Sequence, residues 1–197
     1  MIENLQQLTI DSRGRVIRQE RSDLLGQQPM TLWLTGLSAS GKSTLAYTLE
    51  RGLMARGRAC YVLDGDNVRT GLNNDLGFSA ADRAENIRRT AEVARLMNDA
   101  GLIVIAALIS PLRGDRAHAR KIIGDAFFRE VYVSTPLIVC ESRDPKGHYK
   151  RARTGLVADF TGISSPYEPP SAPDLAIDTN SMTLDNALAA LLTFALA

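Results

Sequence analysis

The residues whose types and spacing most clearly predict chemistry lie between positions 34 and 46, in the stretch LTGLSASGKSTLA. Gly36, Gly41, Lys42 and Ser43 satisfy the pattern G-x-x-x-x-G-K-[ST], which here follows an apolar run and opens a helical one. Glycine lets backbone N–H groups turn towards phosphate oxygens, and the positive end of the following helix attracts the same anion. The sequence therefore predicts a P-loop that binds a nucleotide.

The loop also supplies charge and a metal ligand. Lys42 is expected to reach the β- and γ-phosphates of ATP, and the Ser43 hydroxyl is expected to ligate Mg²⁺. The predicted ATP-binding residues of the loop are Gly36, Leu37, Ser38, Ala39, Ser40, Gly41, Lys42, Ser43 and Thr44.

Other P-loop classes fit the sequence less well. A GTPase would carry an N-K-x-D motif, which is absent, and its D-x-x-G should follow the P-loop, whereas DSRG and DLLG precede it. Large ATPase motors do not fit into 197 residues. A small-molecule kinase remains, and its second substrate must be sought downstream.

Two acidic residues follow the second apolar run. Asp64 and Asp66 are predicted at the carboxyl end of a strand next to the P-loop, where an α/β sheet presents its chemistry. A carboxylate there can orient a hydroxyl or accept its proton, and Asp64 can hold magnesium through water. Arg69 follows within one turn.

A second group of polar residues lies on the next helical segment. Arg83 and Asn86 are three residues apart and are expected to share a helix face opposite an alanine stripe, beside Phe78. A guanidinium fork, an amide and an aromatic ring suit an anionic substrate that carries an aromatic base.

The composition of the chain narrows the possible classes of function. The chain has 45% hydrophobic and 23% charged residues and a net charge of +1, which give no general signal for nucleic-acid binding. Cys60 and Cys140 lie in apolar runs and are expected to be buried free thiols. No apolar run is long enough for a membrane span and no signal pattern opens the chain, so we expect a cytoplasmic protein without a membrane partner.

Hydrophobic periodicity predicts the elements that must position these residues. Strands are predicted at 30–35, 59–63, 102–108, 130–133 and 175–177, and helices at 41–56, 79–100, 116–126 and 183–196. This alternation predicts an α/β fold with a parallel sheet flanked by helices. Residues 1–28 are predicted to be an N-terminal arm, and residues 29–197 the P-loop domain.

The chain resembles the adenylylsulfate kinase (APS kinase) family in five consecutive segments: GLSASGKSTLA, DGDNVRTGLNNDLGFSAADRAENIRR, ALISPLRGDR, VCESRDPKGHYKRAR and DFTGISSPYEPP. The resemblance runs from about residue 30 to residue 178. It implies a nucleoside-monophosphate-kinase-like P-loop NTPase fold with a five-stranded parallel sheet. It also implies transfer of the γ-phosphate of ATP to the 3′-hydroxyl of adenosine 5′-phosphosulfate (APS), in sulfate activation.

The resemblance also implies roles for single residues. Asp66 would orient the 3′-hydroxyl or accept its proton, and Arg69, Arg83 and Asn86 would bind the phosphosulfate and sugar. Phe78 and Phe160 would stack on the APS adenine. Ile109 and Ser110 would lie against the substrate. Ser110 corresponds to a position where relatives often carry a phosphoserine, although direct in-line transfer needs no covalent relay.

A basic segment at 143–153 is predicted to form a lid over the triphosphate, with Arg143 at the ATP and Lys146 at the second substrate. By analogy of fold, Asp178 and Thr179 would hold the ATP adenine. His118 and His148 are expected to be exposed, and no zinc site is expected.

Two alternatives stay open at this point. The first is a kinase of another nucleotide or small hydroxyl compound. The second is a non-catalytic nucleotide-binding module, against which the intact Lys42, Ser43 and Asp66 argue. The family resemblance further implies a homodimer.

Overall fold

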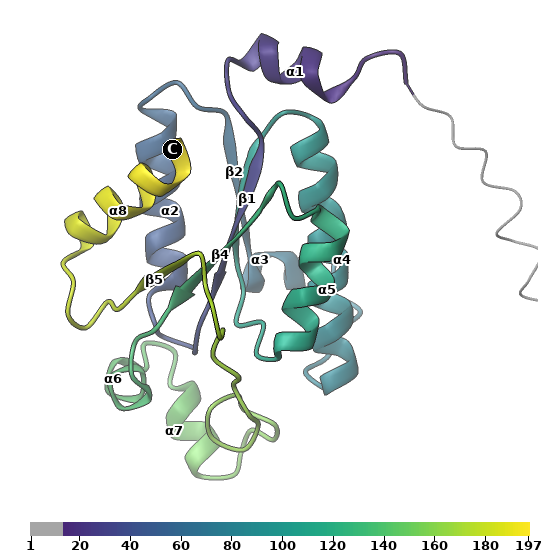
Figure 1. Cartoon of the computed structure of the whole chain (residues 1–197). Helices are drawn as coiled ribbons and strands as arrows, with labels where there is room; N and C mark the ends of the chain where they lie inside the picture. Colours follow the sequence, from purple (N-terminus) through teal and green to yellow (C-terminus); the bar gives the residue numbers. More distant parts are fainter. Residues whose placement is uncertain (1–13) are drawn as a thin grey trace, which may run out of the picture.

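A wholly parallel five-stranded sheet lies between two layers of helices in the computed structural model, which describes residues 14–197 (Figure 1). The strand order is β2-β3-β1-β4-β5. The α/β prediction is thereby confirmed. The strands are β1 (Met30–Thr35), β2 (Cys60–Asp64), β3 (Ile103–Ala107), β4 (Phe128–Val133) and β5 (Leu175–Ile177).

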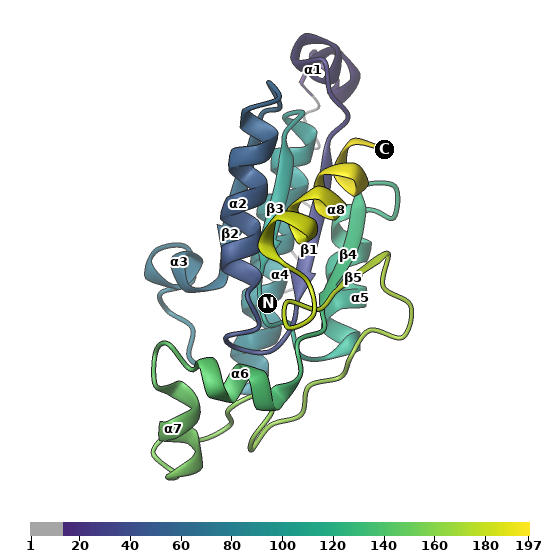
Figure 2. The same ribbon diagram turned by 90° about the vertical axis from the view of Figure 1, so that its left-hand side faces the viewer.

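The helices cover both faces of this sheet, as Figure 2 shows. Helices α2 (Lys42–Met54) and α8 (Leu184–Leu196) pack on one face, and α4 (Ala80–Asp99) and α5 (Arg113–Ile123) pack on the other. Each pair encloses its own hydrophobic cluster, because the strands are buried on both sides.

The central strand β1 shows why the sequence folds this way. Leu32 and Leu34 are fully buried in the α2–α8 cluster, and Trp33 is fully buried in the α4–α5 cluster. Successive side chains of a strand point to opposite faces, so a continuous apolar run fills both layers. The Trp33 ring stacks on Phe128 with centroids 5.7 Å apart.

Some element boundaries differ from the sequence prediction. Strand β4 begins at Phe128 rather than at residue 130, because the Phe128 ring is buried against Trp33. Helix α5 begins at Arg113 rather than at residue 116, where the Arg113 backbone N–H donates to Glu168 Oε2 at 2.8 Å. It ends before Gly124, which has a φ of 97°.

Strand β2 ends beside the P-loop, as predicted, although it does not pair with the P-loop strand. The strand that carries Asp64 is not next to the P-loop strand, because β3 lies between β2 and β1. Asp64 is in register with Ala107 of β3. Contact with the P-loop is instead made across the end of the sheet by helix α2, as described below.

Four short helices were not predicted: α1 (Arg18–Leu25), α3 (Gly65–Thr70), α6 (Leu137–Arg143) and α7 (His148–Arg153). Figure 1 places α6 and α7 at the end of the sheet where the strands terminate, and α1 at the opposite end. Residues 1–13 of the predicted arm lie outside the described residues, and the division at residue 28 stays a prediction.

The segment that enters β1 is attached to the domain. The buried Gln27 side chain donates to the carbonyls of Ala59 and Gly101, both at 2.8 Å, and accepts from the Ala59 N–H at 2.8 Å. Arg21 donates to the Asp99 carboxylate at 2.9 Å. These contacts join residues before β1 to the starts of β2 and β3.

Both cysteines are free thiols, as predicted. Cys140 is buried, but Cys60 is only partly buried, because it lies at the start of the edge strand β2. Within residues 14–197, none of the helices has the length and apolar character needed to cross a membrane.

Candidate active site

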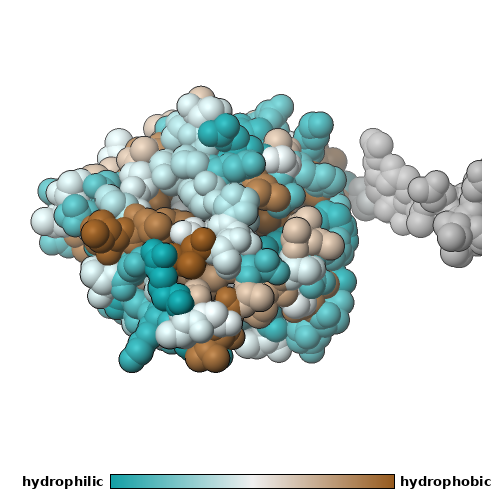
Figure 3. Space-filling view, turned by 90° about the horizontal axis from the view of Figure 1, so that it is seen from below, coloured by the Kyte–Doolittle hydropathy of each residue, from teal (hydrophilic) through white to brown (hydrophobic). Residues whose placement is uncertain are grey.

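A cleft of about 970 Å³ opens at the carboxyl end of the sheet. The P-loop, α3, the start of α4, the segment after β3, the α6–α7 segment and the start of α8 all contribute to its walls. Hydrophobic and hydrophilic side chains alternate on this end of the molecule (Figure 3). The volume of the cleft lies at the upper end of the range for small-molecule sites, so it has room for two substrates.

Two glycines of the P-loop are required by its path. A Cβ at Gly36 would lie 2.6 Å from the Val133 carbonyl oxygen, closer than any side chain allows. Gly41 has a φ of 102°, and a Cβ there would lie 3.2 Å from the Thr179 side chain. The loop therefore packs against the end of β4 and the segment that follows β5, and only glycine permits both contacts.

Lys42 lies across the P-loop. Its Nζ donates to the carbonyl oxygens of Gly36 at 2.9 Å and Leu37 at 2.6 Å, and only 8% of the residue is exposed. Burial removes water from the ammonium and lowers its pKa to about 8, although the charges of Asp64 and Asp66 act in the opposite direction. A phosphate in the loop would restore the favourable environment of the cation.

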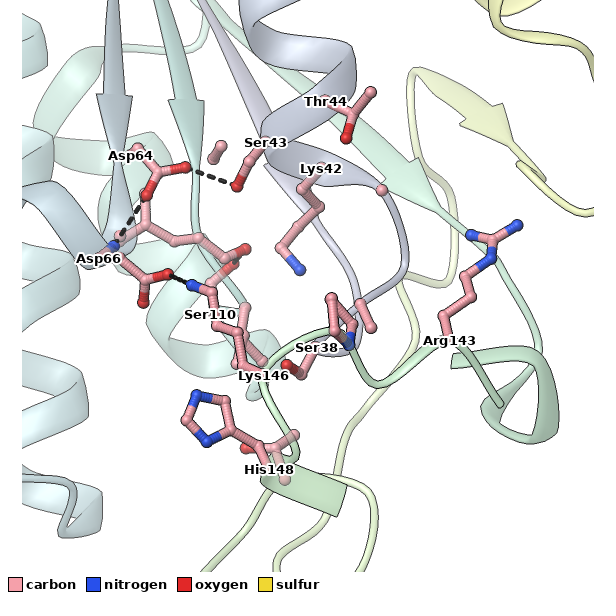
Figure 4. A pocket seen from close by; sticks show the side chains of 18 of the residues that line it. Ser38, Lys42, Ser43, Thr44, Asp64, Asp66, Ser110, Arg143, Lys146 and His148 are labelled. Carbon is pink, nitrogen blue, oxygen red and sulfur yellow. Dashed lines mark hydrogen bonds and ion pairs between the residues drawn. The ribbon is translucent and has the colours of Figure 1, made fainter. Parts of the chain in front are cut away.

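Ser43 and Asp64 form the oxygen-rich part of the cleft (Figure 4). The Ser43 hydroxyl donates to Asp64 Oδ2 at 2.6 Å, and Asp64 Oδ1 accepts from the Asp66 N–H at 2.9 Å, which caps α3. A hydroxyl beside a buried carboxylate is the donor set that Mg²⁺ prefers, so these residues fit that ion.

Asp66 projects into the cleft and forms an ion pair with Lys146 of the segment between α6 and α7 (Figure 4). The hydrogen bond to Asp66 raises the pKa of Lys146. The predicted lid thus contacts the predicted catalytic carboxylate. This pair joins residues 80 positions apart and spans the cleft.

Two aromatic rings, those of Phe78 and Phe160, lie on the cleft. Phe78 is 65% exposed, and the Arg69 guanidinium lies 4.6 Å from the centre of its ring. The Phe160 ring packs edge-on against Tyr149, with centroids 5.0 Å apart. An exposed aromatic ring at a cleft mouth is suited to stacking on a base.

Arg83 contacts protein groups that the sequence did not reveal. Its guanidinium donates to the Asp159 carbonyl and the Thr161 hydroxyl, on either side of Phe160, and its Nε donates to the Phe78 carbonyl at 2.8 Å. Arg83 therefore connects the two aromatic segments of the cleft.

The position of Asn86 corrects the predicted helix face. Asn86 is only 5% exposed and lies on the buried side of α4 with Ile87, rather than opposite the alanine stripe. Its Oδ1 accepts from Asn73 Nδ2 at 2.9 Å, and the residue still lines the cleft.

Ser110 lies at the floor of the cleft with its hydroxyl in the protein interior. The residue is 2% exposed and has a φ of 38°, and its Oγ accepts from the Trp33 indole N–H at 3.1 Å. A buried hydroxyl that already has a donor is poorly placed for phosphorylation. This geometry favours direct transfer over a phosphoserine intermediate.

Arg143 and Thr179 tie the lid to the P-loop. Arg143 donates to Thr179 Oγ1 at 2.7 Å and to its carbonyl at 2.9 Å, and Thr179 Oγ1 also bonds the Ser40 carbonyl at 2.9 Å. Asp178 does not line the cleft, because its carboxylate turns back to accept from the Asn180 N–H at 2.8 Å.

The cleft collects most of the predicted site residues. All the predicted residues of the second substrate line it: Asp66, Arg69, Phe78, Arg83, Asn86, Ile109, Ser110, Lys146 and Phe160. Of the predicted ATP-binding and metal residues, those that line it are Ser38, Ala39, Gly41, Lys42, Ser43, Thr44, Asp64, Arg143 and Thr179. Gly36, Leu37 and Ser40 do not line it, and the carbonyls of Gly36 and Leu37 accept from Lys42 Nζ instead. Asp178 does not line it either, because its carboxylate turns back to the Asn180 N–H.

Several contributors were missed by the sequence reasoning. His148 is partly buried on the cleft wall rather than exposed, whereas His118 is exposed as predicted. The buried Tyr149 donates through its hydroxyl to the Ser38 carbonyl at 3.0 Å. Tyr149 and Ala152, which are the apolar residues of HYKRAR and lie three positions apart, were the available signal. Within residues 14–197 no group of three or more metal-ligating side chains occurs.

Comparisons with known proteins agree with this geometry. A family model described as adenylylsulphate kinase matches residues 28–178. An adenylyl-sulfate kinase of Shewanella pealeana is 56% identical over 177 residues, covering 90% of this chain and 86% of the relative. One of Phocaeicola vulgatus is 54% identical, covering 91% and 88%.

Solved structures give the same assignment. The APS kinase of Mycobacterium tuberculosis, described in complex with AMPPNP and APS, matches with a TM-score of 0.82 and 50% identity, over 84% of this chain and 96% of that one. A sugar kinase from Janibacter, at 20% identity and a TM-score of 0.61, shares the fold alone. With the P-loop, the acidic residues after β2 and the two aromatic segments all on one cleft, this chain belongs to the adenylylsulphate kinase family.

Proposed function

We propose that this protein transfers the γ-phosphate of ATP to the 3′-hydroxyl of adenosine 5′-phosphosulfate, giving 3′-phosphoadenosine 5′-phosphosulfate and ADP. The observation that carries the proposal is a single cleft with a P-loop on one side and a pair of phenylalanines with two arginines on the other. The carboxylate of Asp66 lies on the same cleft. A kinase needs these three parts within reach of one another.

The residues suggest how the transfer proceeds. The 3′-oxygen of the acceptor forms a bond to the γ-phosphorus while the bond from that phosphorus to the β-bridging oxygen breaks, which leaves ADP. Asp66 orients the hydroxyl and accepts its proton. Lys42 stabilises the negative charge that develops on the phosphoryl oxygens.

Magnesium is part of the proposal. The Ser43 hydroxyl would hold the ion directly, and Asp64 would hold it through water. When bound, Mg²⁺ supplies neutralising charge for the phosphate oxygens of ATP. The hydrogen bond between Ser43 and Asp64 keeps both oxygen donors at the edge of the P-loop.

The α6–α7 segment acts as the lid. Arg143 anchors it at Thr179, and Tyr149 anchors it at the P-loop carbonyl of Ser38. Closure over the triphosphate excludes water, which would otherwise accept the phosphoryl group. Lys146 then lies beside Asp66, at the junction of the two substrates.

The biological setting follows from the same proposal. We assign the reaction to sulfate assimilation in the cytoplasm and expect the protein to act as a homodimer. A structure described as a hexameric APS kinase, from Thiobacillus denitrificans, is 36% identical over 84% of this chain and 28% of that one, and it supports self-association within the family.

A coupled ADP-release assay with APS, AMP and adenosine, each at the same concentration, tests the proposal. We expect APS to be the preferred acceptor by a wide margin, and the product to carry the new phosphate on the 3′-oxygen. Preference for AMP would instead identify a nucleoside-monophosphate kinase. ATP binding without ADP release from any acceptor would identify a non-catalytic nucleotide-binding module.

A further inference from the structure

The buried asparagine Asn73 contacts the substrate side of the cleft from behind. It lies between α3 and α4, has no exposed surface and donates from Nδ2 to Asn86 Oδ1 at 2.9 Å. Asn73 does not line the cleft, whereas Asn86 does. Any effect of Asn73 on substrate must therefore pass through Asn86.

This hydrogen bond determines which end of the Asn86 amide is left for a ligand. An asparagine amide has one acceptor oxygen and one nitrogen with two donors. Because Asn73 occupies the Asn86 oxygen, the Asn86 nitrogen remains, and it donates to no group within residues 14–197. The Asn86 amide therefore presents N–H donors to the cleft. Such donors can bind a negatively charged oxygen or a carbonyl oxygen of a ligand.

Stability alone gives a poor account of Asn73. Its own Oδ1 is buried and has no hydrogen-bond partner among the described residues. Such a group costs folding free energy, and a buried unpaired polar atom calls for a reason. The loop is held by other contacts: the Asn73 backbone N–H donates to the Val68 carbonyl at 2.8 Å, and Arg89 binds the Asp75 carboxylate at 2.7 and 2.9 Å.

We propose that Asn73 is a positioning residue that holds the Asn86 amide with its N–H groups towards the cleft, and so makes this point selective for an acceptor group of the substrate. The proposal rests on the proposed function and adds a residue that acts through another. Without Asn73, the Asn86 amide can rotate and present its oxygen, which repels an anionic substrate.

A double-mutant cycle tests this coupling. In the otherwise native chain, we expect Asn73→Ala to raise the KM for APS roughly 3- to 10-fold, the effect of one hydrogen bond. The KM for ATP should stay within about twofold, because the P-loop contacts are unchanged. In the Asn86→Ala background, Asn73→Ala should have no further effect on the KM for APS.

The adjacent Asn74 provides a matched control, since it is exposed and its side chain makes no hydrogen bond within the described residues. Asn74→Ala should leave both KM values unchanged. Asn73→Leu keeps the branched shape of the side chain without its polar atoms and is the second variant if Asn73→Ala fails to fold. It should raise the KM for APS similarly while keeping the melting temperature close to that of the native chain.

The outcomes separate the two proposals. If the native chain phosphorylates APS but Asn73→Ala leaves its KM unchanged, or changes it equally with and without Asn86, the positioning role is refuted and the proposed function stands. If the native chain does not act on APS, the proposed function fails and this inference fails with it.

Discussion

At the scale of single residues, burial changes the acid–base behaviour of Lys42. Its Nζ is held by carbonyl oxygens, which do not compensate for the water it has lost, and its pKa falls from 10.5 to about 8. The cation is therefore present below that pH and is lost as the pH rises through it.

Because ATP binds the ammonium form, we expect the affinity for a non-hydrolysable ATP analogue to fall as the pH is raised through about 8. The value of kcat/KM for ATP should fall over the same pH range, because this ratio reports ionisation of the free enzyme. The corresponding fall in kcat should occur at higher pH. Calorimetry over a pH series measures the affinity for the ATP analogue. Lys42→Met should bind weakly at every pH and show no such step. Constant affinity across this range in the native chain would contradict the assignment.

Asp66 is the residue that we propose as the proton acceptor. Asp66→Asn preserves shape and removes the carboxylate charge, so kcat should fall by roughly 10²- to 10⁴-fold while ATP-analogue affinity changes little. Steady-state kinetics and calorimetry measure the two effects. Lys146→Met breaks the same ion pair from the lid side and should lower kcat less. Equal losses in both variants would show that Asp66 acts only by holding the lid.

At the scale of elements, α4 and the loop after α7 are joined by one side chain. Arg83 of α4 bonds the backbone of Asp159 and the hydroxyl of Thr161, and so fixes Phe160 between them. Burial of the guanidinium lowers the Arg83 pKa, but the group remains charged. The second aromatic platform is thus positioned by a helix that precedes it by about 80 residues.

Arg83→Ala should release the loop that carries Phe160 and weaken APS use by roughly 10- to 150-fold, the effect of a charge-assisted hydrogen bond. ATP-analogue affinity should stay within a few-fold. Kinetics with APS varied, and hydrogen exchange of the loop, measure both consequences. Arg88 on the same helix is exposed and pairs with Glu85, so Arg88→Ala is the matched control. If Arg83→Ala impaired ATP binding and left APS kinetics unchanged, the sites assigned to ATP and to APS would have to be reversed.

At the scale of the whole molecule, helix α1 and the α6–α7 segment lie at opposite ends of the sheet (Figure 1), and residues of the α6–α7 segment line the cleft. Gln27 ties the segment before β1 to the starts of β2 and β3 through three hydrogen bonds, of which the one to the Gly101 carbonyl is buried. Contacts at that end contribute to folding free energy and are remote from the substrates.

Gln27→Ala should therefore lower stability by about 1–3 kcal/mol, because it leaves backbone groups unpaired. For a chain of this size, the melting temperature should fall by several degrees, which calorimetry or circular dichroism detects. The KM values and kcat should be unchanged. The neighbouring Gln28 is exposed, and Gln28→Ala should leave stability unaltered. A kinetic defect in Gln27→Ala would show that the two ends of the sheet are coupled.

The sequence by itself determined the parts of this protein that depend on local pattern. The P-loop follows from the types and spacing of Gly36, Gly41, Lys42 and Ser43, and β1 and β5 have the predicted bounds, because apolar runs between turn residues report buried strands directly. The resemblance in five ordered segments added the substrate side of the cleft, and those residues do line it.

Tertiary structure alone decided which side chains meet. The insertion of β3 between β1 and β2 and the ion pair of Asp66 with Lys146 join segments that are distant along the chain. The burial of Asn86 also depends on how α4 packs. Helix α5 likewise takes its start from Glu168, a residue of a remote loop. The periodicity of apolar residues indicates which face of a segment is buried. It does not indicate which other segment packs against that face. Partner choice depends on how the layers pack, and that is settled only when the whole sheet has formed.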